Sequence, residues 1–370
     1  MKVLLVIDSL GSGGAQRQIV ALAKGLCSRG HEVTIVYYNG PHFFLDKIEK
    51  LPIKVEFLHK KSKMGFEILW KIRNIIRRNS FDVGCAFMIY PSYFLTMGNV
   101  LALKKIKTVT SERTYEKAYS SLVKKFRFMY KFTDRILANS FHQRDVLLQI
   151  FPQYKHKIGT IGNGVFLDDF KFRSNHIFDS NHFKIVAVGR IVALKNIRVL
   201  VNALNILVNQ NNINAYVNYI GREPVSAKDI AEHQYCLQLL KDFNIENRWN
   251  WIGEVNNVEE YLQQNDALVH GSLGEGFPNA VCEAMTKGIP VFASNVYDHP
   301  KVIEHGKSGY VFDPLDANSL ASSLKEFHEL TQDQKQELVR KARTYAENNF
   351  DISIVTKKYE DLFLSLISKK

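Results

Sequence analysis

Residues 274–285 read GEGFPNAVCEAM, and this stretch with its flanks decides the fold. The apolar run ALVH (267–270) precedes it and GIPVFA (288–293) follows it, which predicts a strand, a glycine loop, a short helix and a second strand. The glycines allow the loop backbone to approach a ligand closely. We expect Glu275 in that loop and Glu283 about one turn into the helix.

The start of this helix is a candidate binding site. It spans Phe277, Pro278, Asn279 and Ala280, where proline suits the first turn and free backbone amides attract hydroxyls and anions. Two carboxylates beside free amides suit a polyhydroxylated, phosphorylated ligand. The alternative is an ordinary connection between strand and helix with two solvated carboxylates, and the spacing alone does not choose between them.

The composition indicates two α/β domains in a reducing compartment. With 370 residues, of which 46% are hydrophobic, the chain has enough apolar surface for two cores. Its four cysteines are scattered without close pairs, which suggests neither a disulfide framework nor a zinc site. The apolar run 2–7 is too short and wrongly flanked for a signal peptide, and we expect it to be the first strand.

Two series of alternating strands and helices predict two doubly wound parallel sheets. The first series has strand-like runs at 3–7, 33–37, 55–58, 83–87, 108–110 and 135–138. The second has strand-like runs at 184–188, 215–220, 249–252, 267–270 and 291–293, with helices at 196–209, 231–243 and 258–264. The polar stretch 168–182 is the expected linker. The expected domains are therefore residues 1–170 and 171–350, followed by an amphipathic helix within 351–370.

The uncharged run 86–103 is long enough to raise the question of a transmembrane helix. Pro91, Gly98 and several polar residues interrupt it. A buried strand at 85–89 followed by a buried helix at 92–103 explains the same residues, so we expect no membrane span here.

The net charge of +12 implies an anionic partner. Basic clusters gather in the first 131 residues, and across residues 116–132 apolar side chains recur at helical spacing. Another face of that segment carries Lys117, Lys124, Arg127 and Lys131, which suits a helix lying on an anionic membrane. The alternatives are a helix packed into its own domain and, from charge alone, a nucleic-acid-binding protein, although no signature of nucleic-acid recognition accompanies the charge.

The sequence GSGGAQR (11–17) follows the first strand and opens a helix, so its amides suit a phosphate or a hydroxyl. It lacks the full dinucleotide-binding fingerprint, and Tyr-Tyr-Asn stands at 37–39 where such a site needs an acid. Gly13 and Gly14 are the candidate contacts, with Arg17 beside them. The alternative is a turn that needs its glycines only for close packing.

Arg190 and Lys195 follow the first strand of the second series, at the sheet edge where open α/β sheets bind ligands. Such a pair suits a diphosphate, although two exposed cations are usually only solvated charges. The sequence contains no Asp-x-Asp and no His or Cys cluster with ligand spacing, which favours fixed cations over a metal. Glu304 is a further candidate acid, whose alternative role is to cap local amides.

In this order, the motifs resemble the retaining GT-B glycosyltransferases of glycosyltransferase family 4. The resemblance covers nearly the whole chain and rests on the glycine loop at 11–15, Asn163-Gly164-Val165, Arg190 with Lys195, the run from Glu275 to Glu283, and Glu304. It implies two facing Rossmann-like domains with a nucleotide-sugar in the cleft between them. It also implies that the last helix crosses back to the N-terminal domain.

Residue roles follow from the resemblance by position. Arg190 and Lys195 correspond to residues that hold the donor diphosphate, Glu283 to the residue on the ribose, and Glu275 with the helix start to the donor-sugar contacts. We interpret Glu275 as a donor-positioning residue, not a covalent nucleophile. Gly13 and Gly14 correspond to contacts from the other domain. The segments similar to those that flank the base contain Gly221, Arg222, Glu254 and Val255.

One departure concerns the segment after the strand 108–110. Many members of the family place a histidine there, facing the donor sugar, whereas this chain has Ser111-Glu112-Arg113. It shares these residues with a subset that assembles surface polysaccharides and lipid-linked oligosaccharides. Possible donor or acceptor contacts are Arg17, Glu112, Arg113, Asn163 and Glu304. Gln16 stands where many relatives have Glu.

The sequence therefore predicts a retaining glycosyltransferase that needs no metal or other cofactor. It is expected to move a hexose or N-acetylhexosamine, most readily from a UDP-sugar, to a hydroxyl of a lipid-linked or glycan acceptor. The expected location is cytoplasmic, on the inner face of the cell membrane, without a nucleic-acid partner. The alternatives within the same fold are a nucleotide-sugar epimerase and a phosphorylase.

Overall fold

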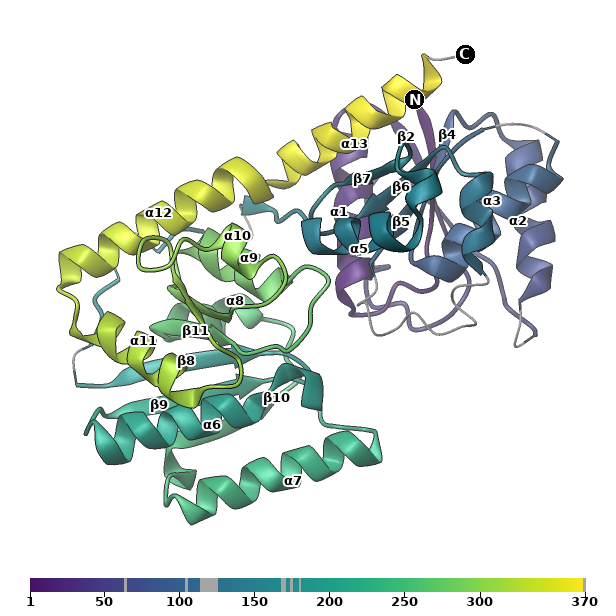
Figure 1. The fold of residues 1–370 in the computed structure, drawn as a ribbon. Helices are drawn as coiled ribbons and strands as arrows, with labels where there is room; N and C mark the ends of the chain where they lie inside the picture. Colours follow the sequence, from purple (N-terminus) through teal and green to yellow (C-terminus); the bar gives the residue numbers. More distant parts are fainter. Residues whose placement is uncertain are drawn as a thin grey trace. The chain divides into compact units, whose positions relative to one another are not determined.

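The computed structural model of the chain divides into two compact units (Figure 1). One unit contains Met1–Gly164 and Phe350–Lys370, and the other contains Val165–Asn349. The structure describes residues 1–62, 65–103, 106–113, 126–167, 171–173, 176–179 and 181–368. Each unit is built around one parallel sheet of its own.

The sheet of the N-terminal unit has the strand order β3-β2-β1-β4-β5-β6-β7. All of its neighbouring strands are parallel. The strands are β1 (Lys2–Val6), β2 (Glu32–Tyr37), β3 (Ile53–Phe57), β4 (Val83–Phe87), β5 (Lys107–Glu112), β6 (Arg135–Ala138) and β7 (Ile158–Thr160). The helices are α1 (Gly14–Ser28), α2 (Phe66–Arg78), α3 (Ile89–Leu101), α5 (Phe141–Ile150), α13 (Ile352–Ile367) and the 3₁₀ helices η2 (Arg127–Lys131) and η3 (Pro152–Tyr154).

The uncharged run 86–103 belongs to this core. Strand β4 is buried along its whole length, and α3 buries seven of its residues against the sheet and α2. Burial on both faces of a parallel sheet explains why this run is so apolar. Within the described residues, no helix is both long and apolar enough to cross a bilayer.

The last helix, α13, packs against α1 although more than 300 residues separate them in the chain. The contact is close at Gly25, where an added Cβ would collide with the side chain of Thr356. Tyr359 and Phe363 of α13 are fully buried in the same hydrophobic cluster as β1 and β2. The C-terminal helix is therefore part of the N-terminal unit's core.

The sheet of the C-terminal unit has the strand order β10-β9-β8-β11-β12-β13 and is also parallel throughout. Its strands are β8 (Phe183–Val188), β9 (Ala215–Ile220), β10 (Trp249–Gly253), β11 (Ala267–His270), β12 (Val291–Ser294) and β13 (Tyr310–Phe312). Its helices are α6 (Ile197–Asn205), α7 (Ala227–Asp242), α8 (Val258–Gln264), α9 (Asn279–Lys287), α10 (His299–Val302), α11 (Ala317–Glu329) and most of α12 (Gln332–Phe350), with short helical turns η5 (Ala193–Lys195), η6 (Ile206–Gln210) and η7 (Glu246–Arg248).

The fold class predicted from the sequence is confirmed, because both sheets are parallel and covered by helices. Two edge strands, β7 and β13, were not predicted, since three residues are too few to show a periodicity.

The basic amphipathic helix expected at 116–132 lies mostly outside the described residues. Its described end, η2, is a 3₁₀ helix.

Candidate active site

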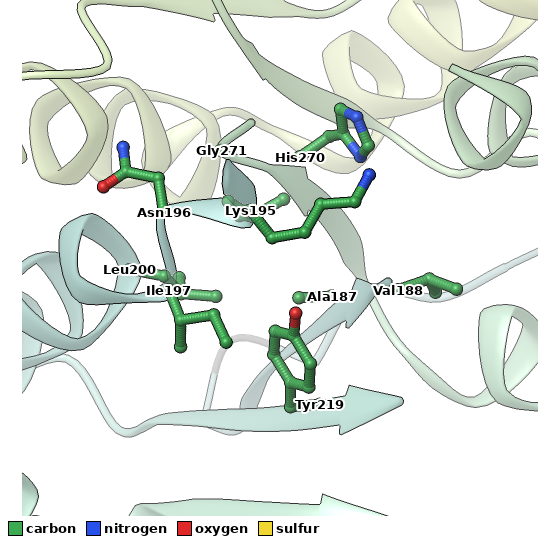
Figure 2. A pocket seen from close by; sticks show the side chains of 10 residues that line it. Ala187, Val188, Lys195, Asn196, Ile197, Leu200, Tyr219, His270 and Gly271 are labelled. Atoms are coloured by element: carbon green, nitrogen blue, oxygen red, sulfur yellow. The ribbon is translucent and has the colours of Figure 1, made fainter. Parts of the chain in front are cut away.

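Strand order reverses in the C-terminal unit between β8 and β11, because the chain runs from β8 through β9 to β10 and then returns to the other side of β8. Open α/β sheets bind ligands at the carboxyl ends of the strands beside such a reversal. A solvent-open pocket lies there, lined by the ends of β8, β9 and β11 and by Lys195 and Asn196 (Figure 2).

Three glycines extend the sheet at this edge. The amide of Gly189 donates to the carbonyl of Ile220 at 2.9 Å, and the amide of Gly221 donates to the carbonyl of Gly253 at 2.9 Å. An added Cβ on Gly221 would collide with the carbonyl of Gly189, so a side chain does not fit there. The backbone of Arg190 and that of Arg222 are thereby brought side by side, and the amide of Ile191 donates to Arg222.

Lys195 and Glu275 form an ion pair at the pocket, between the loop after β8 and the loop after β11. Glu275 is 17% exposed. Its Oε1 also accepts a hydrogen bond from Ser272 Oγ at 2.7 Å and lies 3.1 Å from His270 Nε2. The amide of Leu273 donates to the carbonyl of Leu194 at 2.9 Å, which joins the two loops through their backbones. The structure thus brings together two residues that the sequence placed 80 positions apart.

The electrostatics keep Glu275 ionised. Burial alone raises the pKa of its carboxyl, but Lys195 and the contact with His270 together lower that pKa well below its ordinary value. Burial and the neighbouring Lys195 lower the pKa of His270, so its imidazole is neutral near pH 7. The site therefore contains one carboxylate, one ammonium group and one neutral imidazole in contact.

A second histidine lies beneath this group. His299, at the start of α10, is buried and donates from Nδ1 to the carbonyl of Ser294 at 2.7 Å. Its ring lies edge-on to the ring of His270, with the centroids 5.4 Å apart. Burial and His270 lower the pKa of His299 to about 4. The sequence analysis did not identify His270, Ser272 or His299 as site residues. The available signal was the pair of apolar runs that form β11 and β12, because the carboxyl ends of these neighbouring parallel strands lie near Glu275.

The helix start predicted near Pro278 is present. Pro278 is the N-cap residue of α9 and provides no side-chain cap of its own. Gly288 ends the helix in the left-handed conformation with φ of 79°, as expected for a glycine in this position. Glu283 lies one turn inside α9 and is buried, whereas Phe277, Asn279 and Ala280 are partly exposed. The amides remain the candidate hydroxyl donors.

The other candidates in this unit lie at its surface. Arg190, Arg222 and Glu254 are exposed after β8, β9 and β10, and Val255 is half-buried beside Glu254. Hydrogen bonds from Ser226 and from the amide of Ala193 lower the pKa of the Asp229 carboxyl, and the nearby charge of Arg190 makes a smaller contribution in the same direction. Glu304 is 66% exposed and forms an ion pair with Lys307 in solvent.

The glycine loop of the N-terminal unit leads from β1 into α1. Gly13, Gly14 and Arg17 are exposed, and an added Cβ on Gly13 would meet the side chain of Gln16. Gln16 donates from Nε2 to Asp8 Oδ1 at 3.0 Å, so it ties the helix start to the end of the first strand. The side chain of Gln16 would have to move to make room for a larger residue at 13.

The segment Ser111-Glu112-Arg113 is arranged differently from the sequence-based expectation. Glu112 is 1% exposed, and its carboxylate accepts from Arg127 Nη2 on Oε2 at 2.9 Å and from the Tyr130 hydroxyl on Oε1. Both oxygens are engaged inside the protein. The prediction that Glu112 contacts donor or acceptor is therefore wrong for this structure, because no face of its carboxylate is open to a ligand.

Arg113 joins β5 to the C-terminal helix. Its guanidinium lies 3.8 Å from the centre of the Phe87 ring and donates to Asn163 Oδ1 at 2.6 Å and to the Tyr359 hydroxyl at 3.2 Å. Asn163 is buried. Tyr359 gave no signal in the sequence, because its contact with Arg113 spans 246 positions.

The membrane-contact residues predicted at 117–131 divide into three groups. Lys117 and Lys124 lie outside the described residues. Arg127 is 1% exposed and paired with Glu112, so the prediction that it contacts a membrane is wrong. Lys131 is exposed beside the ring of Phe132. Burial of a guanidinium in an ion pair with Glu112 explains the error, since helical spacing assigned Arg127 to a solvated face.

Two protein-family models match the chain in adjacent segments. The model described as Glycosyltransferase Family 4 matches residues 12–169, and the model described as Glycosyl transferases group 1 matches residues 168–348. Together they span residues 12–348, which contain every strand of the two sheets except β1, the glycine loop from Ser12 onward and the Lys195–Glu275 pair.

Three known proteins illustrate what the chain is similar to. The capsular polysaccharide biosynthesis glycosyltransferase CapH of Staphylococcus aureus is 23% identical over 99% of both chains. An N-acetylgalactosaminyltransferase of Campylobacter jejuni that acts on a diphospho-undecaprenol-linked sugar is 27% identical over 77% of this chain and 78% of its own. The crystal structure of HepE from Anabaena in complex with UDP superposes with a TM-score of 0.82 over 99% of this chain and 100% of that one, at 19% identity.

Proposed function

We propose a donor, an acceptor and a location for this chain, which belongs to glycosyltransferase family 4 and has the GT-B fold. The donor is a UDP-linked hexose or N-acetylhexosamine, and the acceptor is a hydroxyl of a lipid-linked sugar or glycan. The reaction belongs to the assembly of a cell-surface polysaccharide or oligosaccharide. The names of the Staphylococcus and Campylobacter relatives and the UDP bound to the Anabaena protein support this choice.

The observation that carries the proposal is the Lys195–Glu275 pair at the point where the strand order reverses. A diphosphate placed there finds Lys195 and Arg190 as cations and the amides at the start of α9 as hydroxyl donors. Glu275 then offers a carboxylate to the sugar, and Glu283 lies one turn into the same helix for the ribose. These roles are the ones expected from the sequence.

The proposed chemistry is metal-independent transfer with retention at the anomeric carbon. The bond between that carbon and the diphosphate oxygen breaks, and Arg190 and Lys195 stabilise the charge that develops on the leaving group. The acceptor hydroxyl attacks from the same face, and its proton passes to the departing diphosphate. No enzyme nucleophile takes part.

Isothermal titration with UDP and GDP in the presence of EDTA tests the donor site. We expect UDP to bind without divalent metal and Arg190→Ala to weaken it by at least about tenfold, the loss of one charge-assisted contact. Exposed Arg340 on α12 provides the matched control, Arg340→Ala. Binding that appears only with added metal, or binding that Arg190→Ala leaves intact, overturns the proposed clamp.

Product analysis tests the reaction class. The anomeric configuration of the product, measured by NMR, is expected to match that of the donor sugar. A product of opposite configuration excludes retention, and an epimerised nucleotide-sugar without a new glycosidic bond excludes transfer.

We also propose that the N-terminal unit lies on the anionic inner face of the cell membrane, through the outer surface of α2. Phe66 and Trp70 are 52% and 56% exposed, and they share one stripe of the helix with Arg73 and Arg77. Arg73 lies over the Trp70 ring at 5.5 Å and donates to the carbonyl of Leu101 at 3.1 Å, which links this stripe to the end of α3. Exposed aromatic rings beside arginines suit a headgroup layer of negative charge.

Vesicle sedimentation tests the α2 surface. Binding is expected to require anionic lipid and to fall by about tenfold or more in Trp70→Ser combined with Arg77→Glu, since each basic residue near the surface contributes about 1 kcal/mol. Arg340→Glu on α12 is the charge-matched control. Equal binding of both variants places the contact elsewhere.

A further inference from the structure

We infer that His270 is a positioning residue that, with Ser272, holds Glu275 in place when Lys195 leaves the carboxylate for the donor diphosphate. The inference rests on the proposed function, because it assigns what supports the donor-sugar contact of that site. It concerns residues that neither the motif nor the proposed chemistry requires.

The hydrogen bonds of Glu275 are uneven. Lys195, His270 and Ser272 all contact Oε1, and Oε2 has no hydrogen-bond partner within the described part of the chain. A carboxylate that is bonded on one oxygen by three side chains cannot rotate freely. The arrangement therefore fixes Oε1 and leaves Oε2 to accept from a sugar hydroxyl.

The three contacts differ in what a donor does to them. A diphosphate carries more negative charge than one carboxylate and needs cations, so it competes with Glu275 for Lys195. His270 is buried and neutral, and Ser272 is uncharged, so neither is drawn to the phosphate. When Lys195 changes partner, these two neutral donors are the contacts that keep Oε1 in position.

The neutral donors are themselves held from below. His270 is the last residue of β11, in register with Ala293 of β12. Ser294, the next residue of β12, donates from Oγ to the carbonyl of Ser272 at 2.6 Å and accepts on its own carbonyl from His299. The loop that contains Glu275 is thus tied to the neighbouring strand by a buried chain of hydrogen bonds.

Two variants of His270 separate positioning from packing. His270→Leu keeps the volume and removes the donor, whereas in His270→Gln the side-chain amide reaches toward the position of Nε2. We expect His270→Leu to lower kcat by about tenfold to a hundredfold, with the affinity for UDP alone unchanged, because UDP has no sugar for Glu275 to hold. His270→Gln is expected to recover most of the loss.

The pH profile supplies a readout that packing does not move. The charged and titratable groups that face Glu275 are Lys195, His270 and, beneath them, His299. Loss of the His270 donor destabilises the ionised carboxylate and raises the pKa of Glu275, so the acidic limb of kcat/KM moves to higher pH in His270→Leu. His270→Gln is expected to return it toward that of the wild type.

The outcomes distinguish this inference from the proposed function. If the wild-type chain binds no UDP and transfers no sugar, the proposed function fails and the inference fails with it. If the wild-type chain does both and His270→Leu matches it in kcat and in pH profile, only the inference fails. A variant that loses UDP affinity and kcat together, without rescue by glutamine, also overturns the positioning role.

Discussion

Glu112 in the N-terminal unit and Glu275 in the C-terminal unit occupy similar places in their sheets. Both lie at the carboxyl end of a buried parallel strand, or in the loop after it, and both are ion-paired. Glu112 is 1% exposed and uses both oxygens on Arg127 and Tyr130. Glu275 is 17% exposed and uses one oxygen on three partners.

The difference shows how a closed carboxylate is told from one that is available to a ligand in the same architecture. A buried carboxylate whose two oxygens both accept hydrogen bonds fixes the packing around it and has no acceptor left for a ligand. A carboxylate with an open oxygen beside a pocket is stabilised enough to stay ionised and still able to accept. Burial and the number of engaged oxygens distinguish the two carboxylates, whereas their positions after a strand do not.

The largest effect is expected from breaking the buried pair. Glu112→Ala leaves the Arg127 guanidinium buried without its partner, which typically costs about 3–5 kcal/mol of unfolding free energy. Urea unfolding monitored by circular dichroism measures this loss. Glu304→Ala, which breaks a solvent-exposed pair, is the control and is expected to leave the midpoint unchanged. A small loss in Glu112→Ala means that the pair is not as buried as described.

The second largest effect is expected at the open pair, on activity instead of stability. Lys195→Ala removes the cation that we propose stabilises the leaving group and is expected to lower kcat/KM by about a hundredfold to a thousandfold. Lys307→Ala, which removes an exposed ion-paired lysine in the same unit, is expected to retain the wild-type value. Steady-state kinetics with UDP-sugar decide this, and a change below about threefold in Lys195→Ala contradicts the assignment.

A third prediction sharpens the meaning of the open pair. Glu275→Gln removes the charge that holds Lys195, so UDP alone is expected to bind about three- to tenfold more tightly, a gain of roughly 1 kcal/mol, while sugar transfer falls. Calorimetry and kinetics on the same preparation test both parts. Weaker UDP binding in this variant shows that Lys195 does not change partners.

The smallest effect is expected on the pH dependence of stability. It comes from His299, one of the two histidines near Glu275, whereas an arginine and a tyrosine lie beside Glu112. The folded pKa of His299 is about 4, below its ordinary value of 6.5, so the folded state resists protonation and the unfolded state does not. The contribution of His299 to the free energy of unfolding is fully present above pH 6.5. It falls as the pH drops toward 4, by about 1 kcal/mol between pH 6.5 and 5.5.

Comparison with His299→Asn isolates that contribution. Urea unfolding at several pH values is expected to show a smaller loss of stability in His299→Asn over this interval. His305→Asn, at an exposed histidine, is the control and keeps the wild-type slope. Parallel profiles for the wild type and His299→Asn exclude the assigned titration.

Much of the fold was predictable because its signals are local. The runs 83–87, 135–138, 215–220 and 267–270 form strands with the predicted bounds, since an apolar run between turn residues specifies a buried strand. The helix at 258–264 also has its predicted bounds. The prediction of a solvated position for Arg127, in the segment 116–132, was wrong. Helical spacing placed Arg127 on a solvated face, but its partner, Glu112, lies on another element.

By itself, the sequence determined the two parallel sheets, the glycine loops at 11–14 and 274–276, and the presence of Arg190, Lys195 and Glu275 after their strands. Periodicity and turn residues carry that information within a few positions. Only the tertiary structure decided that Glu275 keeps an oxygen open, that Glu112 is closed by Arg127, and that Arg113 contacts Tyr359 across 246 positions. The partners of a charged side chain come from distant segments, and they set its burial, its pKa and therefore its role.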